Sequence, residues 1–292
     1  MSAIAKNDWV YLNGEFVRRD AARISPFDRG FLFAHAAYEV TAIYGGKLID
    51  FGAHLERLGR TLSGIEILPP DIDIEALHHE MMHRNDVTEG LIYIQVSAGD
   101  QGPRDFYGPE EIVPSVFMFS TEKRLISDAA RDGIVVISVA DERWVRRDLK
   151  TTQLLSQSLA YRAARRAGAL TAIMHEDGVV TEAASANAWI VTADGVLVTR
   201  NLSSALLPGI TRGTLARLLR DVGLSVEERA FTLDEIRGAV EAFTSSTGLV
   251  IAPILAMDGE AIGGGKVGPV TRLVQATYYA YLGADLTQID WL

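Results

Sequence analysis

Alternating polar and apolar positions predict hairpins followed by helices in the first part of the chain. The stretches WVYLNGEFVRR and YEVTAIYGGKLIDF are strand-like, and they turn at Asn13-Gly14 and Gly45-Gly46, pairs that tolerate positive φ. Apolar residues then recur at helical spacing in two further stretches, Phe51 to Ile65 and Ile74 to Met81. With strands at LIYIQVSAG and SVFMFS, they form a smaller N-terminal domain, expected over residues 1–120.

The segment after this domain is polar and lacks an apolar period, so we expect an interdomain linker over residues 121–133. A larger domain is expected over residues 134–292. It should hold strands at IVVISVA, NAWIVTA and VIAPILAMDG, a hairpin turning at Asp177-Gly178, and helices near 154–167, 211–223 and 270–282. Mixed strands and helices with many hairpins predict an α+β fold of two domains.

Composition narrows the possible chemistry. The chain has 292 residues, 48% of them hydrophobic, and no cysteine, so thiolate nucleophiles, disulfides and cysteine-bound metals are excluded. A net charge of −10 without long charged blocks argues against nucleic-acid binding. The N-terminal sequence and the lack of a long apolar run predict neither a signal peptide nor a membrane span. These features favour a cytoplasmic enzyme acting on small molecules.

Two short motifs match known signatures without their context. His79-Glu80-Met81-Met82-His83 has the zinc-protease spacing, but both histidines fall opposite the apolar stripe of the expected helix and no third ligand follows. We therefore expect an exposed helix and keep a zinc hydrolase as a distant alternative. The glycines at 263, 265 and 268 have dinucleotide spacing, but too little chain follows them for a second strand, which favours a turn. No G-x-S-x-G elbow is present.

Lysine is scarce, with Lys150 the only one of five at a strand-to-helix junction inside a domain. The cationic neighbours Arg143, Arg146 and Arg147 would favour the neutral amine that imine chemistry requires, whereas the alternative is a solvated lysine before a helix.

Three other features could bind an anion. Leu207-Pro208-Gly209-Ile210-Thr211-Arg212 leads into a helix, whose first backbone N–H groups form a phosphate site or a plain helix start. Hydroxyl donors cluster at Ser245-Ser246-Thr247-Gly248. Arg57 lies off the expected apolar stripe of its helix, as a surface arginine or a phosphate clamp would.

Motifs spread over nearly the whole chain resemble the fold type IV pyridoxal-phosphate enzymes, the branched-chain/D-amino-acid aminotransferase superfamily. The resemblance is closest to the D-amino-acid aminotransferase branch. The motifs occur in the order of that family: YLNGEFV, ISPFDRGFLFAHAAYEV, GGKLIDFGAHLERL, YIQVSAG, ERWVRRDLKT, GVVTEAASANAWIV, LLPGITR, FTSSTG and GGGKVGPVTR.

The resemblance implies a homodimer that binds pyridoxal 5'-phosphate between its two domains. Lys150 would carry the cofactor as an imine and later move the substrate proton, and Glu182 would pair with the pyridine nitrogen. The other implied cofactor contacts are the phosphate ligands Arg57, Ile210, Thr211, Ser246 and Thr247, together with Leu207 under the ring. Tyr38 would line the substrate pocket.

Substrate preference depends on a loop that the resemblance places across the subunit boundary. Arg104 matches the arginine of the family's Arg-x-His carboxylate clamp, but Phe106 stands where histidine is expected. A reshaped clamp could admit (R)-primary amines besides D-amino acids. The expected function is therefore transfer of an amino group from a D-amino acid to a 2-keto acid by a ping-pong mechanism. A branched-chain L-amino-acid transaminase and an aminodeoxychorismate lyase are the alternatives within the superfamily.

Overall fold

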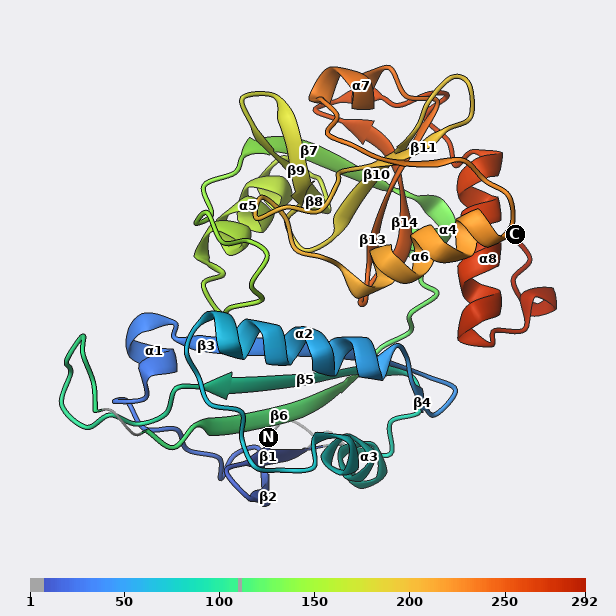
Figure 1. The fold of residues 1–292 in the computed structure, drawn as a ribbon. Helices are drawn as coiled ribbons and strands as arrows, with labels where there is room; N and C mark the ends of the chain where they lie inside the picture. The colour runs from blue at the N-terminus through green and yellow to red at the C-terminus, as the bar shows by residue number, and fades with distance from the viewer. Residues whose placement is uncertain (1–7, 110–111) are drawn as a thin grey trace. The chain divides into compact units, whose positions relative to one another are not determined.

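The computed structural model describes residues 8–109 and 112–292, and these form two compact units. The first unit contains residues up to Arg124 together with the short segment Leu149–Gln153, and the second contains Leu125–Asp148 and Leu154–Leu292. Each unit has its own sheet and hydrophobic core, so the expected α+β architecture of two domains is confirmed. Figure 1 traces the elements of each unit along the chain.

An antiparallel six-stranded sheet, in the order β2-β1-β6-β5-β3-β4, forms the first unit. Its strands are β1 (Trp9–Leu12), β2 (Glu15–Arg18), β3 (Ala36–Tyr44), β4 (Lys47–Leu48), β5 (Gly90–Ser97) and β6 (Ser115–Glu122). Helices α2 (Phe51–Gly64) and α3 (Ile74–Asn85) pack on one face, where Leu58, Leu62 and Met81 meet inward-facing strand residues. A short helix, α1 (Arg29–Phe33), precedes β3.

The second unit is built on a mixed sheet in the order β12-β11-β10-β13-β14-β7-β8-β9, with β15 beside β14. Its strands are β7 (Ile134–Ala140), β8 (Thr171–Glu176), β9 (Val179–Ala183), β10 (Asn187–Val191), β11 (Leu197–Thr199), β12 (Val226–Glu228), β13 (Glu241–Ser246), β14 (Val250–Met257) and β15 (Glu260–Ala261). Parallel pairs join β7 to β8 and to β14.

Helices in the second unit connect strands and cover the sheet. They are α4 (Asp128–Asp132), α5 (Leu155–Arg166), α6 (Ile210–Asp221), α7 (Leu233–Arg237), α8 (Pro269–Leu282) and a 3₁₀ turn at Leu286–Gln288. Helices α6 and α8 contact one another beside β13. None of the helices within the described ranges is long and apolar enough to cross a membrane.

The structure divides the chain differently from the expected domains in two respects. The segment 121–133 contains the end of β6 and helix α4, and the boundary between the units falls within it, between Arg124 and Leu125. Lys150, expected in the C-terminal domain, belongs to the first unit. The physical reason is backbone pairing, because Thr151 forms a bridge with Ala37 at the start of β3.

Candidate active site

Lys150 lies on a backbone segment that is held in place by β3 and α2. The amide of Tyr38 donates to the Lys150 carbonyl at 3.0 Å, and the Lys150 amide donates to Thr61 Oγ1 at 3.2 Å. Hydrogen bonds at both its carbonyl and its amide therefore hold the Lys150 main chain to β3 and α2. A fixed main chain is what a side chain needs when its end must lie close to a reacting atom.

The Lys150 side-chain nitrogen lies over an aromatic ring. Its Nζ is 4.1 Å from the centroid of the Tyr38 ring, and no carboxylate within the described ranges forms an ion pair with it. Tyr38 stacks on Tyr93 with ring centroids 5.3 Å apart, and Tyr93 stacks on Phe119 at 5.0 Å. Burial raises the pKa of the Tyr93 hydroxyl, so this phenol stays neutral. An apolar aromatic row therefore extends across the sheet from the lysine.

Arg57 is buried in the first unit and bound to a carboxylate. Its Nε and Nη2 donate to Glu39 at 2.7 and 2.8 Å, and His54 Nδ1 lies 2.8 Å from the same carboxylate. Burial alone would raise the pKa of Glu39, but the charge and hydrogen bonds of Arg57, together with His54, lower it to about 2. The surface-arginine alternative is wrong, since Arg57 is 3% exposed.

Glu182 is the buried carboxylate of the second unit, at the end of β9. It accepts hydrogen bonds from the guanidinium of Arg143, from the Leu207 amide at 3.2 Å and from Asn187 Nδ2 at 3.1 Å. A carboxylate has about four acceptor positions, so these three donors leave one for a further donor. Burial raises the pKa of Glu182, and Arg143 and the Leu207 amide act against that rise.

A second buried carboxylate fixes Arg143. Asp141 accepts from Arg143 Nε at 2.9 Å and from Nη2 at 2.7 Å, and Thr181 Oγ1 donates to it at 2.6 Å. Burial would raise the pKa of Asp141, but the hydrogen bond and charge of Arg143 outweigh it and lower that pKa. Asp141 thus holds one edge of the Arg143 guanidinium, and the remaining nitrogen, Nη1, donates to Glu182.

The arginines before Lys150 do not supply free positive charge, contrary to the expectation from sequence. Arg143 is neutralised by Asp141 and Glu182, and Arg146 pairs with Asp148. Arg147 Nη2 lies 2.7 Å from Glu176. Each guanidinium is thus matched by a carboxylate of its own unit.

The start of α6 has the features of an anion site. Gly209 precedes the helix, and no side chain caps the first backbone N–H groups, which begin at Ile210 and Thr211. These groups have no partner within the helix, and the helix dipole favours negative charge there. A Cβ at position 209 would lie 2.0 Å from Asn187 Oδ1, so a side chain there would force Asn187 to shift.

Asn187 connects this helix start to Glu182. Its Nδ2 donates both to Glu182 and to the Leu207 carbonyl, the latter at 3.0 Å. Leu207 is therefore fixed at its amide and its carbonyl, and its side chain is half-buried. The expected ring-packing residue and the expected ring-nitrogen partner share one hydrogen-bond network.

The hydroxyl cluster at the end of β13 is divided between core and turn. Ser245 Oγ accepts from the buried Trp189 indole at 2.9 Å, whereas Ser246 Oγ accepts from the Leu249 amide at 3.1 Å. Thr247 is half-buried in the turn between them and β14. Ser246 therefore ends β13 and bonds the turn that begins at Thr247, whereas Ser245 is engaged in packing.

The expected substrate loop lies against α1 in the first unit. The Arg104 guanidinium sits over the rings of Phe33 and Phe106, at 5.2 and 4.7 Å from their centroids. Arg29 donates to the carbonyls of Asp105 and Phe106 at 3.1 and 3.2 Å and so supports the loop from beneath. Phe106 is 71% exposed, so this loop presents a cation framed by aromatic rings.

The zinc-like and dinucleotide-like motifs have the structural roles expected of them. His79 and His83 are exposed, and Glu80 pairs with Arg84 at 2.6 Å. Within the described ranges, no group of three or more histidine, aspartate or glutamate residues could hold a metal ion. The glycines at 263 and 265 lie in a turn with positive φ, and the start of α8 is occupied by the Glu241 carboxylate.

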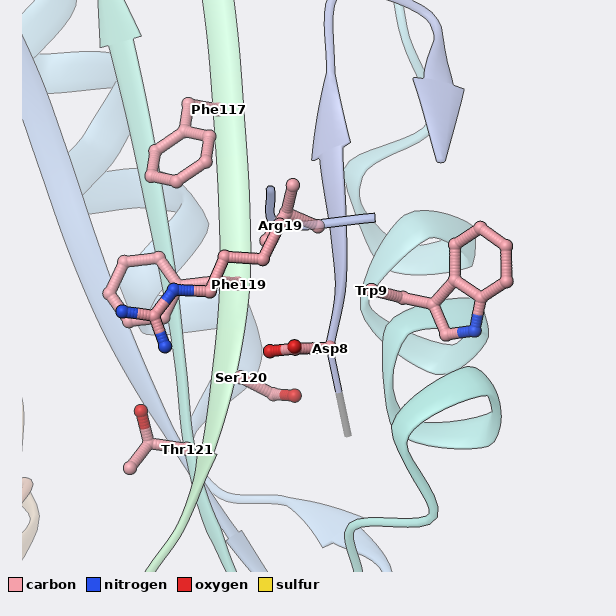
Figure 2. Close-up of a pocket in the computed structure, with 8 residues that line it drawn as sticks. Asp8, Trp9, Arg19, Phe117, Phe119, Ser120 and Thr121 are labelled. Atoms are coloured by element: carbon pink, nitrogen blue, oxygen red, sulfur yellow. The ribbon is translucent and has the colours of Figure 1, made fainter. Parts of the chain in front are cut away.

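A hollow of about 420 Å³ lies elsewhere in the first unit, between β1 and β6. Figure 2 shows the Arg19 side chain extending toward Phe119 and the Asp8 carboxylate pointing toward Ser120. None of the expected cofactor or substrate residues lines it. The hollow therefore adds no group to the candidate site.

Comparison with known proteins identifies the family. Residues 36–257 match the model of amino-transferase class IV. The chain belongs to the class IV aminotransferase family. A D-alanine aminotransferase of Staphylococcus aureus is 33% identical over 94% of this class IV aminotransferase and 97% of the relative. One from Listeria monocytogenes is also 33% identical, over 96% of each chain.

Solved structures of the same fold agree. The branched-chain amino acid aminotransferase of Escherichia coli has a TM-score of 0.86 and 25% identity, covering 94% of this chain and 95% of that one. That of Thermoproteus uzoniensis, solved with norvaline, has a TM-score of 0.81 and 26% identity, covering 97% of each chain. The expectation of a fold type IV aminotransferase is thus confirmed.

The structure adds residues for which the sequence analysis predicted no role in the site. In this class IV aminotransferase they are the supporting carboxylates Glu39 and Asp141, together with His54, Asn187 and Thr181. Some signal was present: Glu39 occupies an inward position of a strand, and His54 and Arg57 are one helical turn apart. A buried acid opposite a buried arginine is a pairing that sequence pattern alone suggests only weakly.

Proposed function

We propose that this class IV aminotransferase uses pyridoxal 5'-phosphate to move an amino group from a D-amino acid to a 2-keto acid. The observation that carries the proposal is the fully buried Glu182, held by three donors and left with an acceptor position for a ring N–H. When bound, the cofactor supplies an electron-accepting ring that stabilises the charge left when the substrate Cα loses its proton. The two half-reactions follow one another in ping-pong order.

The residues of the second unit fit such a cofactor. Because burial raises the pKa of Glu182, a cationic ring nitrogen beside it would favour the ionised carboxylate, and the carboxylate would in turn keep that nitrogen protonated. The uncapped start of α6 would bind phosphate through the amides of Ile210 and Thr211. Ser246 and Thr247 would add hydroxyl donors, and Leu207 would pack under the ring.

The residues of the first unit supply a base and a cation. Lys150 would hold the cofactor through Nζ and, once released by the substrate amine, would move the proton from the substrate Cα. The Tyr38 ring lies beside this nitrogen and would line the substrate pocket. Arg57 would bind the phosphate.

The D-amino-acid preference is supported by the two D-alanine aminotransferases, which align over nearly the whole chain. Activity toward (R)-primary amines is supported by Phe106 beside Arg104 and by the aromatic row that begins at Tyr38. The branched-chain L-amino-acid alternative is favoured by the fold shared with the Escherichia coli enzyme. An aminodeoxychorismate lyase remains the third candidate.

The proposal includes a cytoplasmic homodimer in which the loop carrying Arg104 and Phe106 completes the site of the second subunit. The exposed Phe106 ring supports this, because an apolar side chain on a loop tip gains from burial against a partner.

Half-reactions followed by absorbance test the proposal. Purified protein should be yellow, and borohydride should attach the cofactor irreversibly to the peptide containing Lys150. We expect D-alanine to convert the bound cofactor faster than L-leucine, with (R)-phenylethylamine ranking the amine activity. Lys150→Ala should slow the half-reaction by about a thousandfold or more, whereas Lys266→Ala, in the glycine-rich turn, should leave it unchanged.

Four results would reject parts of the proposal. Labelling at Lys266 would reject Lys150 as the lysine that carries the cofactor, and a colourless protein after reconstitution would reject the cofactor itself. A faster reaction with L-leucine than with D-alanine would replace the D-amino-acid preference with the branched-chain one. Cofactor binding without any half-reaction would indicate a binding protein.

A further inference from the structure

We propose that Glu39, supported by His54, is the positioning residue that orients the Arg57 guanidinium toward the cofactor phosphate. The inference rests on the proposed function, because it assumes that Arg57 binds that phosphate. Glu39 is a carboxylate, and its negative charge by itself opposes phosphate binding.

The contact between Glu39 and Arg57 fixes the plane of the guanidinium. One carboxylate oxygen accepts from Nε at 2.7 Å and the other from Nη2 at 2.8 Å, so the two planar groups lie edge to edge. Both side chains are nearly fully buried, at 4% and 3% exposed. A bidentate pair of this kind leaves the arginine little rotational freedom, and a phosphate would meet another edge of the same fork.

His54 fixes the carboxylate in turn. It precedes Arg57 by one helical turn on α2, and its Nδ1 lies 2.8 Å from the Glu39 oxygen that also binds Nη2. An ionised carboxylate only accepts hydrogen bonds, so Nδ1 carries the proton in this contact. His54 is 3% exposed, and β3 therefore holds an acid between two donors of one helix.

The sign of the charge separates positioning from a simple electrostatic role. Glu39 is negative, so removing its charge would by itself strengthen the attraction between Arg57 and a phosphate dianion. If Glu39 instead orients Arg57, its removal weakens phosphate binding despite the gain in positive potential. The two roles thus predict opposite changes.

The experiment compares pyridoxal 5'-phosphate with pyridoxal, which lacks the phosphate, in titrations of the full-length apoprotein. The measured quantity is the ratio of their dissociation constants. We expect Glu39→Gln to reduce the phosphate preference by about tenfold or more, and His54→Gln by a smaller factor. Glu39→Asp, which keeps the charge, should recover part of it. Glu56→Gln, on the exposed side of the same helix, is the matched control and should change nothing.

Several outcomes would overturn the inference. An unchanged or increased phosphate preference in Glu39→Gln would show that Glu39 does not position Arg57. An equal loss of affinity for both ligands would indicate a general structural role, which thermal unfolding of each variant would reveal independently. If Glu39→Gln fails to fold, His54→Gln carries the test, and its unchanged preference would count against the proposal.

Arg57→Leu separates this inference from the proposed function. It should abolish the phosphate preference that Glu39→Gln only reduces. If Arg57→Leu keeps the preference while D-alanine still converts the bound cofactor, the positioning role of Glu39 is rejected and the aminotransferase activity stands. If the unaltered protein binds neither ligand and shows no half-reaction, the proposed function itself has failed.

Discussion

At the scale of single residues, the main feature of this protein is a set of buried ion pairs. Asp141, Arg143 and Glu182 in one unit, and Glu39 with Arg57 in the other, are charged groups removed from water and held by mutual hydrogen bonds. Such pairs add little net stability compared with apolar packing, but losing one partner leaves an unpaired buried charge that costs several kcal/mol. Their presence therefore points to a demand for fixed charge at these positions.

The low pKa of Glu39 predicts a pH-dependent contribution to stability. Folding lowers that pKa from 4.5 to about 2, so the contribution is complete above pH 4.5 and is lost as pH falls toward 2. The shift corresponds to on the order of 3 kcal/mol. Urea unfolding between pH 7 and 2.5 should show the unaltered protein losing its advantage over Glu39→Gln in that window. A difference in unfolding free energy between the two proteins that stays constant with pH would contradict the lowered pKa of Glu39.

Sequence reasoning located the charged residues better than their surroundings. The order of motifs predicts roles for Lys150 and Glu182, and these stay predictions, but no pattern showed that Arg57 is buried. The apolar spacing predicts that Arg57 lies off the core-facing stripe of its helix. In the structure the buried face of α2 runs through His54, Arg57, Leu58, Thr61 and Leu62. Three of these buried residues are polar, so a face predicted from apolar residues alone is displaced from the true contact face.

At the scale of elements, the strong periods were predicted and the short elements were not. Hairpins turning at Asn13-Gly14 and Asp177-Gly178, and helices α2, α3, α5, α6 and α8, lie where the pattern indicated. Most of the missed elements are short, namely α1, α4, α7, β11, β12 and β15, and the six-residue β13 was missed as well. Helices of five residues and strands of two or three contain too few positions to establish a period, and their ends are set by tertiary contacts.

The start of α6 gives a prediction that depends on a single methyl group. Gly209→Ala would place Cβ against Asn187 Oδ1, displacing the amide that donates to Glu182 and Leu207. We expect a loss of about 1–3 kcal/mol in unfolding free energy, together with weaker cofactor binding. Gly213→Ala in the same helix meets nothing within 4 Å and should be neutral or stabilise by up to about 1 kcal/mol. Equal effects of the two substitutions in urea unfolding would argue against this account.

At the scale of the whole molecule, two separate cores predict two patterns of local unfolding. Val96 lies in the core of the first unit and Val198 in that of the second, and both are fully buried. Truncation of either to alanine should cost about 2 kcal/mol.

Hydrogen exchange measured by mass spectrometry distinguishes them. Val96→Ala should speed exchange in peptides covering β3 and in the segment 149–153 together, because that segment pairs with β3. Val198→Ala should act first on β10 and β11. If Val198→Ala instead speeds exchange in the segment 149–153, this segment unfolds with the second unit and does not belong to the first.

The placement of the segment Leu149–Gln153 has a consequence for how the gene can be recombined. The codon for Lys150 lies inside the stretch that encodes the second unit, yet the backbone partners of this lysine, at Ala37, Tyr38 and Thr61, are encoded far upstream. Exchanging the first 124 codons between relatives would leave the lysine and its flanking codons untouched while replacing every neighbour that anchors its main chain in the first unit. A chimaera joined at that boundary would therefore inherit Lys150 from one parent and the residues that hold its main chain from the other.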